Sequence, residues 1–485
     1  MAFEDFDEYE ELSVVSDLHL GGARDSAIFM EGEAFQAFCR QQAKSKRRLG
    51  FVVNGDFVDF LPDRPAKTYF DGSDAVGQLD EIAKDERFAP VFRGLQELLT
   101  KKADAQLIIT IGNHDLELAV PRVREKLLDL IDPSGATRRR IRLSLDGSGY
   151  RCRVGTASVV CIHGNDVDNW NVNDYEALRR HLRGENFGKG ADEWTPNAGT
   201  KLVVDVMNGL KRRYPFVNLL QPTVGAVLPL LAALEPPLVP LLDDGLRIAT
   251  KLGVDAIRRW AGFLGDGDRQ PIDTPVVTGP VSALRSPFSA MRGADHREEQ
   301  ERFMAELEQR FERNDDPHLL DAGPEAQLGR FTPLRPFFHR DKKKAARKAL
   351  EELATDRSLE LNAIDSQARH LDKLAGGGAR IVVAGHTHLP RSHSRQAGWY
   401  LNSGSWTVTG GLKPIDWVDD ARFDIVWKAI EQQDSQALWD AGLLRRNRGV
   451  ATVRKEPKRI VAGLLMIAED GAEGGFVKDS QWVVE

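Results

Sequence analysis

Residues 12–19 read Leu12-Ser13-Val14-Val15-Ser16-Asp17-Leu18-His19, and the architecture is built outward from this stretch. The first four residues are largely apolar and predict a short buried strand, which the polar pair Asp17 and His19 follows directly. Side chains two positions apart on a strand point the same way, so this carboxylate and imidazole can reach one ion. An Asp-x-His pair alone is usually an ordinary loop pair without a ligand.

Four further polar clusters follow predicted strands in the same way. The run 51–53 leads into Asn54-Gly55-Asp56-Phe57-Val58-Asp59, and the run 107–111 leads into Gly112-Asn113-His114-Asp115. The run 159–162 leads into His163-Gly164-Asn165, and the run 380–384 leads into Gly385-His386-Thr387-His388. Taken singly, the clusters after 51–53 and 159–162 are better explained as turns, the cluster after 107–111 could equally be a helix N-cap, and a lone His-x-His is often a surface pair.

Together, the five clusters favour a site. All of them lie at the carboxyl ends of predicted strands, the edge at which open α/β sheets assemble their sites. Five of the eleven histidines lie in these clusters. The ligand types are imidazole, carboxylate and amide without thiolate, a set that suits borderline to hard divalent ions. We therefore predict a divalent metal site at this edge.

Composition and the pattern of apolar residues divide the chain into two similar core blocks, residues 11–166 and 379–485, and a different middle segment, residues 167–378. In the first block, apolar runs alternate with helical patterns over residues 31–46, 86–101 and 116–131, which is typical of α/β layers. Residues 139–162 favour antiparallel strands. In the second block, strands are predicted over 399–402, 460–466 and 481–484.

The middle segment is rich in proline and glycine, with charged helices predicted over residues 295–313 and 340–374. We interpret it as a large, mainly helical insertion or cap. Its apolar stretch, residues 216–242, either shields a lipid chain or contacts a membrane peripherally, or forms a buried hairpin broken by its prolines. We favour the hairpin.

Composition bounds the remaining possibilities. Hydrophobic residues make up 41% of the 485, enough for a packed core, and the net charge of -7 weakens nucleic acid as a partner. Cys39, Cys152 and Cys161 show no CxxC spacing, which favours a reducing compartment without a disulfide framework. The acidic N-terminus lacks a signal-peptide pattern, and no run of about 18 apolar residues predicts a membrane span. We expect a cytoplasmic protein.

The order of the five motifs resembles that of the calcineurin-like metallophosphoesterase superfamily, over roughly residues 12–166 and 380–406. The resemblance implies an α/β fold, a two-layer β-sandwich flanked by helices, with a dinuclear metal centre at the sheet edge. The turn Asn402-Ser403-Gly404-Ser405 also resembles the segment that follows the family's last motif.

The resemblance also assigns residues to the two ions. One ion is bound by Asp17, His19 and His388, the other by Asn113, His163 and His386, and Asp56 bridges them. His114 matches a family histidine that binds no metal and contacts the scissile phosphate or the leaving group. Asn165 departs from the family, which often has histidine or aspartate there, and we place it beside the ligands.

The implied chemistry is phosphoester hydrolysis by a hydroxide that two divalent ions generate near neutral pH. Mn²⁺ is expected from the mixed nitrogen and oxygen ligands, with Fe, Zn, Ni and Mg as alternatives. Asp59 and Asp115 either orient His114 and the ligand histidines or simply cap turns. Arg24, Arg391 and His393 lie near the motifs and are interpreted as solvent-facing loop residues.

The substrate is a phosphoester of open identity, lipid-linked or nucleotide. Residues 17–21 and 55–59 resemble the branch of UDP-2,3-diacylglucosamine pyrophosphohydrolases, but His114 stands where that branch usually has arginine, and this chain is about twice as long. We therefore predict a general phosphodiester or pyrophosphate hydrolase.

Two alternatives stay open. The first is a DNA or RNA nuclease with the same site, its groove lined by the basic runs 138–140, 211–213 and 340–348. A solvated helix face is the favoured interpretation of each run. The second is a non-catalytic metal-binding scaffold module, which the intact ligand set disfavours. The sequence predicts no oligomeric state.

Overall fold

The computed structural model describes residues 6–23, 27–65, 67–168, 171–188, 194–208, 211, 343–344, 347, 361–410, 415–431 and 435–484. The chain divides into two compact units, residues 1–223 with 354–485, and residues 224–353. Both predicted core blocks belong to the first unit, and everything below concerns that unit. Arg24, the apolar stretch 216–242 and the charged helix 295–313 lie outside the described residues. The predicted domain boundaries stay predictions.

An eight-stranded sheet forms the first layer, in the order β15-β14-β13-β2-β3-β4-β5, with β16 paired to β14. Its first half is parallel and consists of β2 (Glu11–Val15), β3 (Leu49–Asn54), β4 (Gln106–Thr110) and β5 (Ile141–Ser144). Its second half is antiparallel and consists of β13 (Gly449–Glu456), β14 (Arg459–Ile467), β15 (Glu473–Phe476) and β16 (Trp482–Val484). The two core blocks therefore share this sheet.

A six-stranded sheet forms the second layer, in the order β1-β6-β7-β8-β10-β9. The strands are β1 (Glu8–Tyr9), β6 (Tyr150–Val154), β7 (Ala157–Cys161), β8 (Ile381–Ala384), β9 (Arg391–Arg395) and β10 (Gly398–Asn402). Strands β7, β8 and β10 run parallel, and β6 and β7 are antiparallel, as the pattern of residues 139–162 predicts. A two-stranded ribbon, β11 (Val408–Gly410) with β12 (Leu444–Arg446), stands apart from both sheets.

Alternation along the central strands builds two hydrophobic cores. Leu12 and Val14 of β2 face the core between the sheets, while Val15 faces the core beneath the helices. Val52 on β3 and Ile108 on β4 repeat the inward orientation, because side chains alternate across a strand. Both faces of the central sheet are thus covered, which explains why its strands read as continuous apolar runs.

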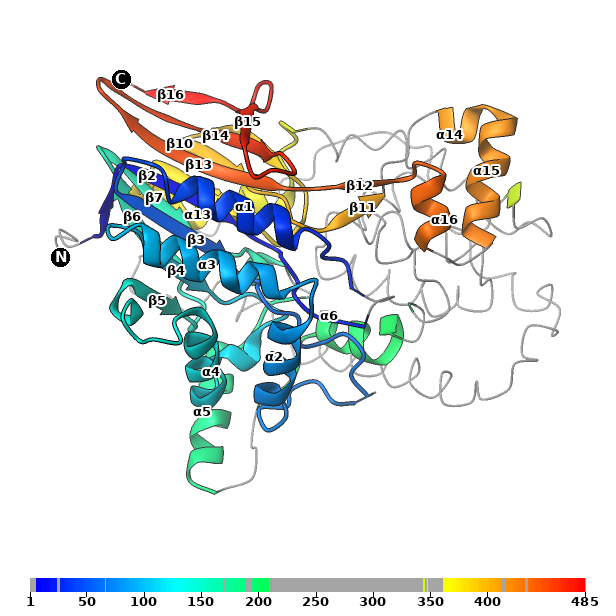
Figure 1. Ribbon diagram of the computed structural model, residues 1–485, viewed down its shortest axis with the longest axis horizontal. Coiled ribbons are helices and arrows are strands. Elements are labelled where there is room, and N and C mark those ends of the chain that lie inside the picture. Colours follow the sequence, from blue (N-terminus) through cyan, green and yellow to red (C-terminus); the bar gives the residue numbers. More distant parts are fainter. Residues whose placement is uncertain are drawn as a thin grey trace, which may run out of the picture. The chain divides into compact units, whose positions relative to one another are not determined.

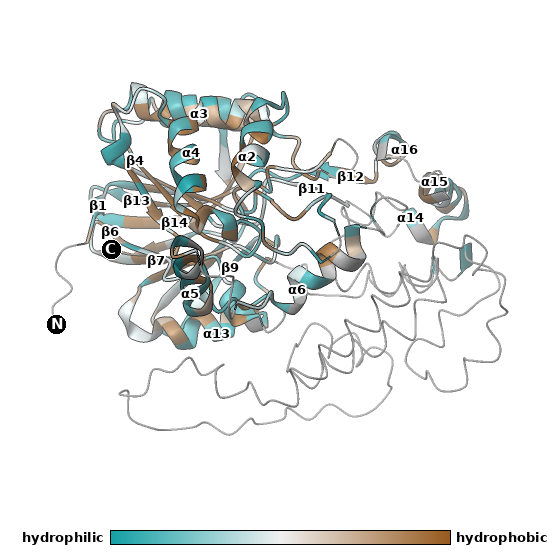
Figure 2. Cartoon of the chain, turned by 90° about the horizontal axis from the view of Figure 1, so that it is seen from below, coloured by the Kyte–Doolittle hydropathy of each residue, from teal (hydrophilic) through white to brown (hydrophobic). Residues whose placement is uncertain are grey.

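Four helices cover the outer face of the eight-stranded sheet: α1 (Gly32–Gln42), α2 (Ala75–Lys84), α3 (Ala89–Lys101) and α4 (Pro121–Ile131). Helices α1 and α3 lie side by side along the strands (Figure 1). Phe35 of α1 packs edge-on against Trp406, with ring centroids 5.1 Å apart. In Figure 2 the strands β4, β13 and β14 are largely brown, whereas much of the outward side of α3 is teal. The predicted two-layer sandwich flanked by helices is confirmed.

The remaining helices in the described part of the chain are α5 (Tyr175–Asn186), α6 (Ala198–Lys201), α13 (Ser366–Ala375), α14 (Ile415–Val418), α15 (Asp420–Glu431) and α16 (Ser435–Asp440), with a π-helix over Leu202–Met207. None of the described helices is long and apolar enough to cross a membrane. The three cysteines are buried and unpaired.

Two expectations about local structure are wrong. The helix predicted over residues 340–374 does not run through residues 361–365, because the Asp365 side chain accepts a hydrogen bond from Ala368 N and starts α13 afresh. The predicted helix over 116–131 splits into a 3₁₀ turn, Leu116–Ala119, and α4, which begins at Pro121.

Arg391 and His393 are also misplaced by the sequence analysis, since both lie on β9 and are buried rather than solvent-facing. Arg391 pairs with Asp365, with 3.3 Å between Nε and Oδ2. His393 stacks on Tyr400, with ring centroids 4.9 Å apart. A five-residue strand of alternating polar residues carries no apolar signal, so nothing in its composition predicts burial.

Asp365 combines a helix cap with the partner of a buried arginine, so Asp365→Ala is expected to destabilise the protein strongly. Removing the carboxylate beside the buried Arg391 guanidinium should lower the free energy of unfolding by about 3–5 kcal/mol, including the lost cap. Asp419→Ala removes an exposed carboxylate that accepts from Arg422 N in the same way, and should cost only about 1 kcal/mol. Denaturant unfolding of both variants measures the difference, and equal losses would contradict the buried-pair argument.

Candidate metal centre

The five polar clusters meet where the carboxyl ends of the two sheets come together. Three follow β2, β3 and β4 of the large sheet, and two follow β7 and β8 of the small one. Backbone hydrogen bonds join the loops, from His19 N to Asp56 O at 2.9 Å and from Gly385 N to His163 O at 3.0 Å. The site therefore belongs to both layers of the sandwich.

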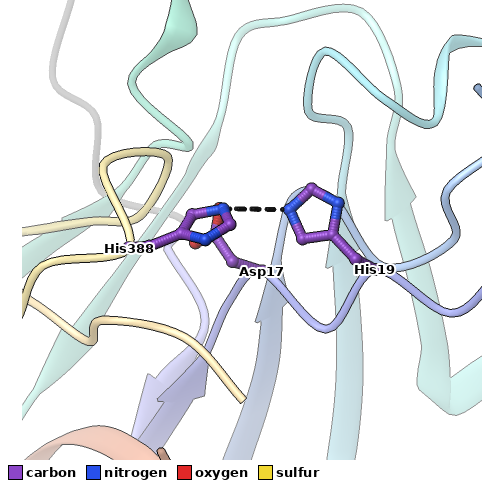
Figure 3. A group of neighbouring side chains, drawn as sticks. All are labelled: Asp17, His19 and His388. Atoms are coloured by element: carbon purple, nitrogen blue, oxygen red, sulfur yellow. Dashed lines mark hydrogen bonds and ion pairs between the residues drawn. The ribbon is translucent and has the colours of Figure 1, made fainter. Parts of the chain in front are cut away.

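The first group of side chains consists of Asp17, His19 and His388, with possible ligand atoms all within 4.8 Å of one another. Figure 3 shows the two imidazoles turned toward each other, with Asp17 between them. The Nε2 atoms of His19 and His388 are 3.0 Å apart, and His388 Nε2 is 3.3 Å from Asp17 Oδ1. These three side chains would hold an ion between them.

The second group consists of Asp56, His163 and His386, again within 4.8 Å. Asp56 Oδ2 lies 3.2 Å from His163 Nε2 and 3.6 Å from His19 Nε2, so one carboxylate faces both groups. This placement suits the bridging role expected of Asp56. Asn113 Oδ1 is buried and has no hydrogen-bond partner, as a ligand oxygen would be.

Hydrogen bonding fixes which histidine nitrogens are available. His163 Nδ1 lies 2.9 Å from the Asn54 carbonyl oxygen, which can only accept, so Nδ1 carries the proton. In the neutral ring, Nε2 then directs a lone pair at the Asp56 carboxylate, and this buried atom has no hydrogen-bond partner. Lone pair against carboxylate is repulsive unless a proton or a metal ion lies between them, so this position can hold either. The donor set therefore fits a pair of divalent ions.

The electrostatics of the site point to the same need for positive charge. Burial alone would lower the pKa of His163, but the Asp56 and Asp17 carboxylates raise it to about 10. Burial works against ionisation of Asp56 as well, yet His163 and His114 hold its pKa well below the usual range. Two ionised and fully buried carboxylates create a local negative field that attracts cations.

Five predicted ligands have an unusual backbone conformation. Asp17, His19, Asp56, His386 and His388 have φ values of 55°, 51°, 48°, 70° and 56°. Residues other than glycine rarely adopt this left-handed region, and each instance costs roughly 1–3 kcal/mol. The backbone bonds between the loops hold the chain in these conformations, which aim the side chains into a shared space.

Two motif glycines allow the loops to approach the ligands. A Cβ atom on Gly112 would lie 2.1 Å from Asp56 Oδ1, and one on Gly385 would lie 2.6 Å from Asp17 Oδ2. No side chain fits at either place without displacing a ligand.

Asp59 and Asp115 take different roles. Asp59 orients two histidines, with Oδ2 3.0 Å from His19 Nδ1 and Oδ1 2.9 Å from His114 Nδ1. Asp115 instead accepts from Gly112 N at 2.6 Å and from Phe57 N at 2.9 Å, so it holds the loops in place. Burial and the nearby Asp56 raise the pKa of Asp115 to about 7.

His114 lies beside the first group, its ring 4.7 Å from that of His19 and edge-on to it, and with His19 and Asp56 it forms a third group whose possible ligand atoms lie within 4.8 Å of one another. Its role beside the ions rather than on them stays a prediction. Burial lowers its pKa, but the Asp59 and Asp56 carboxylates outweigh this and raise it to about 9. At neutral pH the ring is therefore an imidazolium with a hydrogen-bond donor to offer.

Two further polar residues lie near the site without belonging to any of the five motifs. Asp168 Oδ2 lies 2.9 Å from His386 Nε2, although no motif spacing marks it. Lys211, which was interpreted as part of a solvated basic run, is half-buried, and burial lowers the pKa of its ammonium group although the Asp59 and Asp63 carboxylates oppose this shift. Asn208, three residues earlier, donates to Leu61 O at 3.0 Å and so holds this segment against the loop after β3. Both residues come from the chain that follows the fourth motif, where sequence patterns give no signal.

Comparison with known proteins agrees with this geometry. Residues 12–217 match the family model described as calcineurin-like phosphoesterase. No curated protein matches the sequence. A solved structure of a Vps29 single mutant from Entamoeba histolytica is 12% identical, with a TM-score of 0.13, and the match covers 26% of this chain and 49% of that one. This chain thus spans about half the length of that structure, and so weak a likeness has no bearing on function. The family match and the His/Asp groups support a metal-dependent phosphoesterase in general terms.

Gly112→Ala is expected to weaken metal binding about tenfold or more, because the added methyl would push the Asp56 carboxylate from its position. Gly112 has an ordinary φ, so the effect comes from the contact and not from the backbone. Gly475→Ala is the matched control, since its Cβ would meet no atom within 4 Å. Metal content after dialysis against a fixed Mn²⁺ concentration measures the effect. Equal metal content in the two variants would contradict the close approach.

Proposed function

We propose that this protein hydrolyses phosphodiester or pyrophosphate bonds, with two divalent ions held by Asp17, His19, Asp56, Asn113, His163, His386 and His388. The observation that carries the proposal is the Asp56 carboxylate, which faces histidine nitrogens of both groups at 3.2 and 3.6 Å. Mn²⁺ is the proposed ion because the ligand set mixes nitrogen and oxygen.

Two ions bound at such a site supply an activated water and neutralise phosphate oxygens as charge shifts during the reaction. The residues of the chain provide the remainder of the mechanism. Asp59 fixes the His19 ring by accepting from Nδ1, which leaves Nε2 for an ion. The same carboxylate fixes His114 through its Nδ1, so the Nε2–H of the imidazolium can donate to a phosphate oxygen or to the leaving oxygen.

Lys211 adds a positive charge near His114 that would attract an anionic substrate. It is half-buried close enough to His114 for its charge to lower the pKa of that ring. An ammonium group held beside the site adds positive charge where a second phosphate or a diester oxygen would lie.

The nuclease alternative has less support in the described part of the chain. Arg138 pairs with Asp129 at 2.5 Å, and Arg140 donates to the carbonyl oxygens of Lys102 and Ala105. Side chains engaged in this way are poorly placed to line a groove for a phosphate backbone. Lipid-linked pyrophosphates and nucleotides remain the proposed substrate classes, with cytoplasmic location as part of the proposal.

The direct test is hydrolysis of bis(p-nitrophenyl) phosphate by protein stripped with a chelator and reloaded with Mn²⁺. Activity should vanish on stripping and return with the ion. Asp56→Asn should reduce kcat/KM at least about a hundredfold, because a bridging carboxylate supports both ions, each worth several kcal/mol. Asp470→Asn, an exposed turn aspartate that accepts from Ala472 N, should leave activity unchanged.

Lipid pyrophosphate and single-stranded DNA are then compared as substrates under the same conditions. Folded protein that hydrolyses none of the three with any divalent ion would refute the enzyme and leave the scaffold alternative. Faster cleavage of DNA than of either small substrate would favour the nuclease.

His114→Gln tests the proton donor through the leaving group. If the imidazolium protonates the leaving oxygen, an alkyl ester should slow by about 10²–10⁴-fold, whereas a p-nitrophenyl ester, which leaves without a proton, should slow by less than about tenfold. Parallel kcat measurements on the two esters give the ratio. Equal slowing of both would show that His114 acts only on the phosphate oxygens.

A further inference from the structure

The second group of ligands is supported by residues that no motif contains. The chain after the fourth motif turns through a 3₁₀ helix, Asn165–Val167, and brings Asp168 against His386. Asp168 Oδ2 lies 2.9 Å from His386 Nε2 and accepts a second hydrogen bond from Asn171 Nδ2 at 2.6 Å. One oxygen of Asp168 thus links the predicted metal ligand His386 to Asn171, in the same loop as Asp168.

Asn171 extends this network to the opposite ligand. Its side-chain oxygen accepts a long hydrogen bond, 3.5 Å, from Asn113 Nδ2. That bond turns the Asn113 amide nitrogen toward Asn171, while the amide oxygen is buried and has no hydrogen-bond partner. Of the two amide orientations, this is the one that can bind an ion.

The position of Asn171 is itself fixed. Its carbonyl oxygen accepts from Asn165 Nδ2 at 3.1 Å and from Asn197 Nδ2 at 3.2 Å. Its backbone N–H donates to Asp168 O at 3.0 Å. The loop is held by side chains from both of its flanks, and Asn165 is wholly buried. This is a built support, because every polar atom of Asn171 is used.

We propose that Asp168 and Asn171 are positioning residues that orient His386 and Asn113 toward the second ion. Asp168 accepts the Nε2–H of His386 and leaves Nδ1 as the ligand nitrogen, in parallel with Asp59, which accepts from His19 Nδ1 and leaves Nε2. Asn171 sets the Asn113 amide and holds Asp168. The inference rests on the proposed function, since it presumes two ions, and it assigns these residues to the second ion alone.

The experiment is Mn²⁺ binding to the stripped full-length protein, followed by calorimetry and by electron paramagnetic resonance. Wild type should bind two ions and give the spectrum of a coupled pair. Asp168→Ala should weaken one ion by about 10–100-fold and leave the other unchanged, so that a mononuclear spectrum appears at intermediate Mn²⁺. Asp168→Asn keeps a hydrogen-bond acceptor, so its affinity for the weakened ion should lie between those of wild type and Asp168→Ala. Asn171→Leu should weaken the same ion less than Asp168→Ala.

The matched control is Asp470→Ala, which removes an exposed turn carboxylate and should bind both ions as wild type does. Two bound ions in wild type with unchanged affinities in Asp168→Ala would overturn the inference and leave the proposed function standing. Equal weakening of both ions would also overturn it, because the effect would then belong to the whole site. Wild type that binds no ion would overturn the proposed function and the inference together.

Discussion

Parallel pairing of β7 with β8 is the constraint on which the site depends. Val159 lies opposite Ile381 in this ladder, so two segments far apart in the chain become neighbours in one sheet. Closing a long loop costs only slowly more as the loop lengthens, so a large insertion between these strands is tolerable. The pairing aligns the carboxyl ends of β7 and β8, and thereby brings His163 beside His386. The same six-stranded sheet packs on β2 through Leu12 and Val14, which sets Asp17 opposite both.

The site combines several energetically unfavourable features, and all of them favour the binding of a cation. Left-handed backbone at Asp17 and Asp56, buried carboxylates and unpartnered lone pairs all raise the free energy of the folded state. Each of them also lowers the cost of holding a cation, because the ligands are already fixed in place before binding. Strain spread through the loops is offset by the two well-packed cores on either side of β3 and β4. Stability comes from the sandwich, and the strained and charged loops are concentrated at its edge.

The sequence predicted the parts of this arrangement that depend on local pattern. Apolar runs such as residues 51–53 lie on buried strands, and the glycine after them marks a turn that only a small residue allows, since a Cβ on Gly55 would meet the His163 ring. Of the seven expected ligands, the two aspartates and four histidines lie in two groups whose possible ligand atoms are within 4.8 Å of one another, and the ligand assignment itself stays a prediction. Local pattern does not predict the burial of polar side chains. Arg391 is buried because it pairs with Asp365, and only the fold brings these two residues together. Asp168 escaped notice for the same reason, because its role depends on a loop that turns back toward His386.

Asp59 gives the site a property that no single ligand has. One carboxylate holds His19 through one oxygen and His114 through the other. An ion that draws electron density from His19 strengthens the hydrogen bond from His19 Nδ1 to Asp59. Asp59 then accepts less strongly from His114, and the proton of His114 is bound more weakly. By thermodynamic reciprocity, the protonation of His114 must then alter the affinity for the ion by the same factor. The imidazole signal of His114 in a nuclear magnetic resonance spectrum would therefore shift as the site fills with ions, and would report its occupancy.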